Sequence, residues 1–219
     1  MAAYSDPLFK KGMEITMTPN TALEYVIQQY SDFVGETAIF KADRGIQYCV
    51  TKMNGEVGEL LDKLADMIKY DLNSEFMQFP ENAQLDLILE LGDVCWYSVA
   101  LLRELGFDFR NFSLDAVSGP LLTNNFIHTS MLVAGRAGAI SERSGKIIRD
   151  KDGDGTNTSY LAHEAFVLST IKDLLLMLRL LDILAEQFDS SLTYVISRNV
   201  EKLKSRKDRG TLRGSGDHR

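Results

Sequence analysis

Four carboxylates in two short motifs are the residues of this chain best suited to chemistry. Glu56 and Glu59 stand three positions apart, and Glu90 and Asp93 repeat that spacing further along the chain. Residues three apart lie on one face of an α-helix, so each motif presents two carboxylates together. Two antiparallel helices that face each other would bring all four acids to one place. Carboxylate oxygens at this density suit Mg²⁺, with Mn²⁺ as the alternative.

The surroundings of the second motif strengthen this interpretation. Glu90 and Asp93 lie within the segment LILELGDVCWYSVALL, which offers few other polar side chains. A buried, unpaired carboxylate costs several kcal/mol, so it must be protonated, paired or bound to a cation. The alternative for the first motif is a pair of exposed helix acids that form ion pairs with Lys52 or Lys63.

The elements that must position these acids are helices. Apolar residues recur at steps of three and four over most of the chain, and there are only four prolines in 219 residues. Asn20 or Thr21 is expected to cap a first helix that runs to about Thr37, and Gly106 has the character of a C-terminal stop. The later helices are expected at about 43–70, 81–106, 121–149, 160–187 and 190–207. The pattern therefore predicts an all-α helical bundle.

The second half of the chain is similar to the first. The segment MNGEVGELLDKLADMIKYD, from Met53, aligns with VAGRAGAISERSGKIIRD, from Val133. At a constant offset of 80 residues, the coinciding positions are Gly55 with Gly135, Gly58 with Gly138, Leu60 with Ile140, Ile68 with Ile148, Val94 with Leu174 and Leu101 with Leu181. This predicts an internal duplication, which would give a pseudo-dimer within one chain. Two unrelated amphipathic helix pairs of similar length are the alternative.

The second copy loses most of the acids. At the same offset the exchanges are Glu56 to Arg136, Glu59 to Ala139, Glu90 to Thr170 and Lys63 to Arg143, while Asp93 stays an acid as Asp173. The second half is therefore expected to be a scaffold, or a wall for one site. The expected parts of one compact domain are a lead-in at 1–20, a metal-binding half at 21–112, a degenerate half at 113–189, and a C-terminal helix with a basic tail at 190–219.

Two stretches resemble a known family. GEVGELLDKL followed by ELGDVCWYSVALLRELGFD is similar to the MazG-like all-α nucleoside triphosphate pyrophosphohydrolases, whose signature is ExxE on one helix and ExxD on the next. The chain's end, RNVEKLKSRKDRGTLRGSGDHR, also resembles the C-terminus of phage and bacterial members. The resemblance covers about 20–112 and 190–219, and the predicted duplication would account for 113–189.

The resemblance implies a Mg²⁺-dependent hydrolase that converts a nucleoside or deoxynucleoside triphosphate to the monophosphate and pyrophosphate. Glu56, Glu59, Glu90 and Asp93 would hold the metal, and Glu59 or Glu56 would orient or deprotonate the attacking water. Family enzymes build their core from paired units, so a homodimer or larger homo-oligomer is also expected as a possibility. The competing hypothesis is a non-catalytic nucleotide- or metal-binding regulatory protein on the same scaffold.

Candidate substrate-binding residues are mostly basic. They are Lys63, Trp96, Asn199, Lys202, Arg206, Arg213 and Arg219. The three from 199 to 206 recur at steps of three and four, so one face of the last helix could bind phosphate or sugar. A solvated basic face is the alternative there. Trp96 could stack on a base, although a tryptophan in so apolar a helix more often belongs to the core.

Composition excludes other classes of function. The net charge of −7 disfavours stable nucleic-acid binding. Cys49 and Cys95 lie in apolar helical patterns, which predicts buried free thiols. The first residues have no apolar core of a signal peptide, and no apolar run is long enough to span a membrane. The expectation is a cytoplasmic enzyme.

Overall fold

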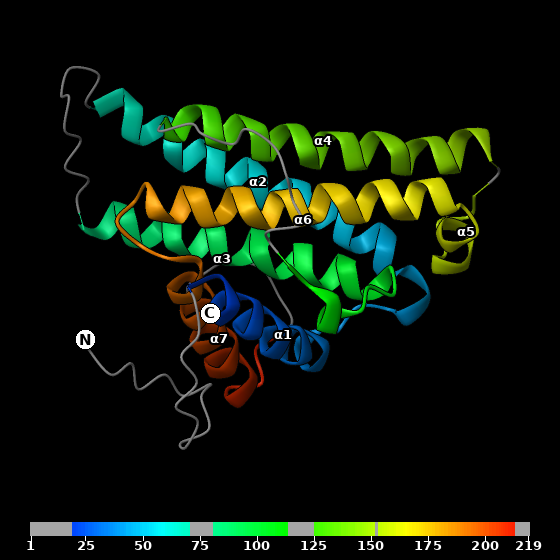
Figure 1. The fold of residues 1–219 in the computed structure, drawn as a ribbon, viewed down its shortest axis with the longest axis horizontal. Coiled ribbons are helices and arrows are strands. Elements are labelled where there is room, and N and C mark those ends of the chain that lie inside the picture. The colour runs from blue at the N-terminus through cyan, green and yellow to red at the C-terminus, as the bar shows by residue number, and fades with distance from the viewer. Residues whose placement is uncertain (1–18, 71–80, 114–124, 152, 213–219) are drawn as a thin grey trace.

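The computed structural model describes residues 19–70, 81–113, 125–151 and 153–212, and every regular element in these ranges is a helix (Figure 1). The prediction of an all-α fold is confirmed. The elements are α1 Pro19–Thr37, η1 Ala42–Arg44, α2 Gly45–Tyr70, α3 Glu81–Glu104, η2 Phe109–Asn111, α4 Phe126–Asp150, α5 Asn157–Leu161, α6 Glu164–Glu186 and α7 Leu192–Asp208. No helix in the described ranges has the length and apolarity needed to cross a membrane.

Four long helices form the central bundle. α2 packs against α3 and α4, and α6 packs against α4 and α3. In Figure 1 these helices run along the long axis of the molecule, with α4 at the top and α3 below. α1 and α7 contact each other and also pack on α3. α3 is therefore enclosed by helices from both ends of the chain.

The core follows the apolar spacing of the helices. The buried stripe of α2 consists of Ile46, Val50, Met53, Val57, Leu60 and Leu64. Burial of each such side chain contributes roughly 1.5–3 kcal/mol, so this stripe is enough to fix which face of α2 points inward. The cysteines are buried free thiols, as predicted, and burial raises the pKa of Cys95 to about 12.

Gly106 ends the third helix, as predicted. Its φ of +74° lies in the left-handed region that favours glycine. Gly106 N–H donates to the Arg103 carbonyl at 2.9 Å, and Phe107 N–H donates to the Leu102 carbonyl at 3.0 Å. These two bonds satisfy carbonyls that the end of α3 would otherwise leave without partners.

Two helices begin at residues other than those expected. α4 begins at Phe126, where Asn125 Oδ1 accepts a hydrogen bond from His128 N–H at 3.1 Å. The helix expected over 160–187 is two helices, because the backbone of His163 has non-helical angles of φ −112° and ψ 87°. Thr156 caps the first of them by accepting from Ser159 N–H at 3.2 Å. Side-chain caps mark the starts of α4 and α5, and the periodicity of the apolar residues does not predict them.

The helix pairs α2–α3 and α4–α6 keep the offset of 80 residues. Moved by that offset, the bounds of α2 fall within one residue of those of α4, and those of α3 within three residues of α6. Coinciding core positions are buried in both pairs: Met53 and Val133, Val57 and Ala137, Leu60 and Ile140, Val94 and Leu174, and Leu101 and Leu181. The two pairs thus bury the same positions of their helices.

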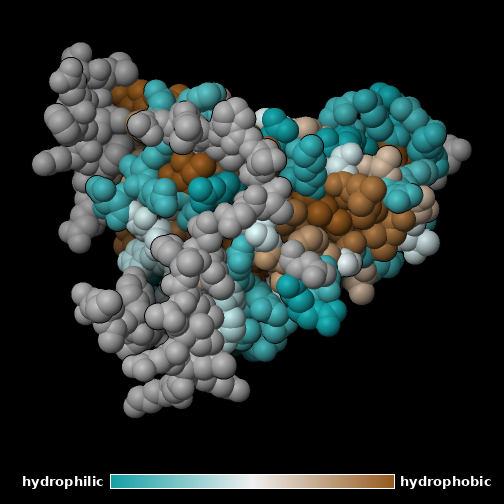
Figure 2. All heavy atoms as spheres, in the orientation of Figure 1, coloured by the Kyte–Doolittle hydropathy of each residue, from teal (hydrophilic) through white to brown (hydrophobic). Residues whose placement is uncertain are grey.

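Part of the second pair is exposed and apolar. Figure 2 shows apolar side chains gathered on the right of the molecule, over the first half of α6, where Leu168 is 59% exposed. Exposed apolar patches often mark contact surfaces. The expected homo-oligomer stays a prediction.

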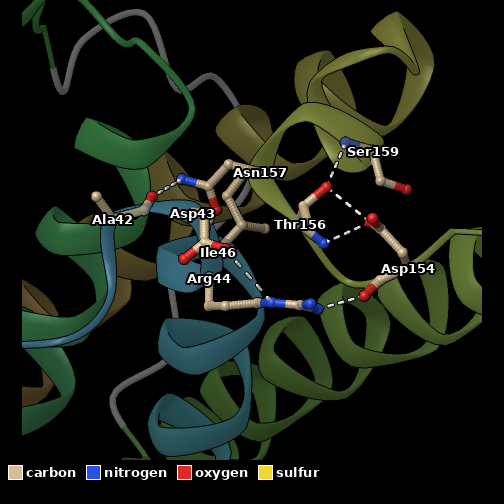
Figure 3. Close-up of polar contacts among 8 residues, drawn as sticks. All are labelled: Ala42, Asp43, Arg44, Ile46, Asp154, Thr156, Asn157 and Ser159. Atoms are coloured by element: carbon tan, nitrogen blue, oxygen red, sulfur yellow. Dashed lines mark hydrogen bonds and ion pairs between the residues drawn. The ribbon is translucent and has the colours of Figure 1, made fainter.

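The start of α2 is joined to α5 by a polar contact that spans more than a hundred residues of sequence. Ile46 N–H donates to Asn157 Oδ1 at 2.9 Å, and Asn157 Nδ2 donates to the Ala42 carbonyl at 2.9 Å (Figure 3). Asn157 Nδ2 also donates to Glu104 Oε2 at 2.6 Å. Beside it, Arg44 Nη1 donates to the Asp154 carbonyl (Figure 3). One amide side chain therefore ties α2, α3 and α5 together.

Substitution of Asn157 by alanine is expected to destabilise the fold. It leaves Ile46 N–H and the Ala42 carbonyl without their partner, which costs on the order of 1–3 kcal/mol. Chemical denaturation of Asn157→Ala measures the loss. The control is Thr158→Ala, at an exposed neighbouring position of the same helix. Equal stability of the two variants would show that the contact contributes nothing.

Candidate metal centre

Carboxylates from α2 and α3 converge at one place in the bundle. Glu56 on α2 and Glu90 and Asp93 on α3 each offer one oxygen, and these oxygens lie within 4.8 Å of one another. Glu90 is 1% exposed and Glu56 is 8% exposed, while Asp93 is partly buried. Three of the acids that the sequence spacing singled out are therefore neighbours in largely buried surroundings.

Glu59 lies apart from this group. Its side chain is exposed, and it is not among the acids that converge in the described part of the chain. Residues three apart on an α-helix are rotated by about 60° from each other, so Glu59 turns toward solvent when Glu56 faces α3. Its negative charge still helps to raise the pKa of Glu56. This corrects the expected arrangement: three acids converge, and the fourth stands at their edge.

A lysine contacts each converging carboxylate. The pairs are Lys52 with Glu56, at 3.3 Å between Nζ and Oε1, Lys63 with Glu90, and Lys202 with Asp93. The first two lysine side chains are 43% and 34% exposed, so solvent reaches them. The third comes from α7 and is 10% exposed. Lys63 and Lys202, expected to bind substrate, thus contact the carboxylates directly.

Asp93 is held by a hydrogen-bonded chain that crosses three helices. Asn199 Nδ2, on α7, donates to Asp93 Oδ1 at 2.8 Å, and Tyr30 OH, on α1, donates to Asn199 Oδ1 at 2.7 Å. Burial raises the pKa of Tyr30 well above its ordinary value, so its hydroxyl stays a donor. Sequence reasoning missed Tyr30, because a contact between residues 169 apart leaves no local pattern.

Glu56 holds its proton more tightly than an ordinary glutamate. Burial, followed by the negative charge of Asp93, raises the pKa of Glu56 from 4.5 to about 7. The Lys52 ammonium acts in the opposite direction and does not offset the burial. Near neutral pH the carboxyl therefore exchanges its proton readily, which is the property required of a general base.

The donors of this group fit a divalent cation bound through oxygen. Two ligand oxygens of an octahedral Mg²⁺ are about 3 Å apart when adjacent and about 4.2 Å apart when opposite, given bonds of about 2.1 Å. The three oxygens lie within 4.8 Å of one another, so a movement of the side chains toward one another would let them share one ion. Glu56, Glu90 and Asp93 are thus the residues that would hold a metal ion.

The Gene 37 protein of Mycobacterium phage L5 is similar to this chain. The two are 39% identical over 92 residues, which are 42% of this chain and 75% of the phage protein. This chain belongs to the family of the Gene 37 protein. No protein-family model matches the chain, and no solved structure matches it. The name of the phage protein states no activity, so the activity of this Gene 37 family member must be argued from its site.

Two of the remaining candidate residues of this Gene 37 family member, Trp96 and Arg206, are in the described part of the chain. Trp96 is 8% exposed and donates from Nε1 to Thr37 Oγ1 at 3.0 Å. This placement favours the core alternative over base stacking. Arg206 is buried further along α7. Arg213 and Arg219 lie outside the described residues.

The second helix pair carries a different cluster at the matching place. Arg136 Nη1 donates to Asp173 Oδ1 at 3.1 Å, and Arg143 Nη2 donates to Asp173 Oδ2. At the 80-residue offset, Asp173 and Arg143 correspond to Asp93 and Lys63. A guanidinium group therefore stands where the first pair has its glutamate on α2.

Glu56→Gln tests the raised pKa in metal-free protein. A carboxyl group with a higher pKa in the folded state stabilises the fold fully below its unfolded value of 4.5 and loses that contribution as the pH rises toward 7. Glutamine does not titrate. Between about pH 4.5 and 8, the stability of the variant relative to the wild type should therefore rise by ~1–3 kcal/mol.

Chemical denaturation in EDTA over this pH range measures the difference. Glu142→Gln, at an exposed acid of α4, controls for the loss of one surface charge. If the stability difference between Glu56→Gln and the wild type does not vary with pH, the pKa of Glu56 is not raised in the folded protein.

Proposed function

We propose that this protein is a Mg²⁺-dependent nucleotide pyrophosphohydrolase, which converts a nucleoside or deoxynucleoside triphosphate to the monophosphate and pyrophosphate. The observation that carries the proposal is the convergence of Glu56, Glu90 and Asp93, each with a lysine beside it. Such a site offers negative charge to a metal ion and positive charge to phosphate groups. The resemblance of the ExxE and ExxD motifs to the MazG-like all-α enzymes supports the same assignment.

An internal duplication, which we also propose, makes the second helix pair an instructive comparison. There Arg136 supplies positive charge to Asp173 from the position that corresponds to Glu56. A buried carboxylate needs a cation in either pair. Where α2 carries an acid at that position, the added negative charge favours an external cation beside the protein's own lysines. The exchange of Glu56 for Arg136 therefore supports metal binding in the first pair alone.

The chain's own residues would then divide the chemistry. Mg²⁺, when bound, would neutralise phosphate charge and lower the pKa of a coordinated water. Glu59 or Glu56 would orient the attacking water and accept its proton, and attack between the α and β phosphates would release pyrophosphate. Lys52 and Lys63, which are partly exposed, would bind phosphate oxygens. Asn199 would keep the Asp93 carboxylate in position.

One observation favours the competing function, a binding protein without turnover. Each converging carboxylate already has a lysine partner, so the charges of the cluster nearly balance without a metal ion. Such balanced clusters also occur as structural ion pairs. Turnover separates the two functions, whereas nucleotide binding alone is common to both.

The decisive measurement is pyrophosphate release from a panel of canonical and modified nucleoside and deoxynucleoside triphosphates, with Mg²⁺ and with EDTA. Glu90→Gln and Asp93→Asn are expected to lose at least about 100-fold in turnover, because each removes a metal ligand. Glu59→Gln is expected to lose turnover while Mg²⁺ binding, measured by calorimetry, persists, because Glu59 stands at the edge of the group.

Glu142→Gln again serves as the matched control and should keep full activity. Unfolding curves of each variant establish that it is folded. If no nucleotide is hydrolysed with Mg²⁺ or Mn²⁺, the enzymatic function is wrong and the binding protein remains.

The duplication predicts that a second cation site can be restored. In the double variant Arg136→Glu and Thr170→Glu, two acids would join Asp173 at the positions that correspond to Glu56 and Glu90. Saturating Mg²⁺ should then stabilise this variant by an additional amount on the order of 1–3 kcal/mol relative to the wild type. Arg136→Ala, which removes the guanidinium without adding an acid, should show no such gain. An unchanged Mg²⁺ stoichiometry in calorimetry of the double variant would argue against the correspondence.

A further inference from the structure

A groove lies between the first turns of α3 and α7. Its volume is about 580 Å³, and its walls include Leu85 and Ile88 on α3, Tyr194 and Arg198 on α7, and Ser190 just before α7. Ligand pockets in proteins commonly have volumes of roughly 300–1,000 Å³. The groove is thus large enough for a small organic molecule.

The groove lies N-terminal to the carboxylate group along both α3 and α7. Arg198 and Lys202 are four residues apart and so share one face of α7, and Lys202 donates to Asp93 Oδ2. On α3, Ile88 precedes Asp93 by five residues, which is about 7.5 Å of helix rise. Along both helices the groove is thus one to two turns N-terminal to the carboxylate group, a separation that a molecule with its phosphate groups at the carboxylates could span.

The walls combine an aromatic face with polar atoms. Tyr194 is 38% exposed and Leu85 is 36% exposed. Ser190 Oγ and Arg198 Nε are buried and have no hydrogen-bond partner among the described residues. Arg198 is held in place by an ion pair with Glu201 at 2.5 Å. A ligand with a flat face and a polar edge would bind the ring and face the polar residues Ser190 and Arg198.

We propose that this groove binds the nucleoside part of the triphosphate, with the base against the Tyr194 ring and polar groups of the base or sugar on Arg198 and Ser190. The placement of the phosphates rests on the proposed hydrolase function, whereas the groove is argued from its own shape and chemistry. Base stacking, which the sequence suggested for Trp96, is thereby assigned to an exposed ring on another helix.

The first experiment uses uncharged deoxynucleosides in EDTA, so that it needs neither metal nor turnover. Titrations followed by NMR of the protein should show binding to the wild type. Tyr194→Ala should weaken that binding at least about fivefold, because a base loses its stacking partner. Tyr194→Phe keeps the ring and should bind nearly as the wild type does. Leu168→Ala, at an exposed apolar residue of α6, is the matched control and should change nothing.

The second experiment separates this proposal from the hydrolase function. If turnover is found, Tyr194→Ala should raise KM for the nucleotide at least about fivefold with little change in kcat. Its binding of inorganic tripolyphosphate with Mg²⁺, which has no nucleoside, should be unchanged. Deoxynucleoside binding without any pyrophosphate release would support the groove and reject the hydrolase. If pyrophosphate is released, and Tyr194→Ala binds deoxynucleosides as tightly as the wild type and has the same KM, the hydrolase function is supported and the groove proposal is overturned.

Discussion

The burial of three carboxylates at one point between α2 and α3 is the constraint on which the rest of the structure depends. Glu90 lies almost fully inside the protein, and Glu56 and Asp93 bring two more acids within 4.8 Å of it. Burial of unpaired charge costs several kcal/mol for each group. The fold therefore has to deliver positive charge to this point, and lysines from α2 and α7 do so.

The position of α7 follows from the same constraint. A Cβ atom at Gly92 would lie 3.0 Å from Asn199 Cβ, so the glycine is what lets α7 approach α3 this closely. That approach carries Asn199 and Lys202 onto Asp93, and Tyr30 fixes the direction of the Asn199 amide. The last helix is thus part of the carboxylate site, although it is more than a hundred residues away in sequence.

The spacing of residues along the chain was enough to predict the helices and the three acids that converge, because both depend on spacing within one helix. The spacing did not predict that Glu59 is exposed. Glu59 is rotated by about 60° from Glu56 around the helix axis, and only the packing of α3 against α2 shows which of the two side chains faces the core. The spacing also missed Tyr30, whose partner lies on another helix. Trp96 belongs to the core because its indole finds Thr37, a contact that no local pattern reports.

The two helix pairs show how similar helix packing can surround a buried aspartate with residues of opposite charge. In both pairs, an aspartate on the second helix accepts a hydrogen bond from a cationic side chain. Asp173 accepts from Arg136 on the first helix of its pair, and Asp93 accepts from Lys202 on α7. With Arg136 at the matching position, Asp173 has two guanidinium partners within the protein and needs no ion. With Glu56 there, burial and the charge of Asp93 raise the pKa of that glutamate to about 7 despite Lys52, so a divalent cation would compete with a proton and with one lysine. The exchange of one residue, Glu56 for Arg136, would thus make the first pair receptive to metal near neutral pH and the second pair indifferent to it.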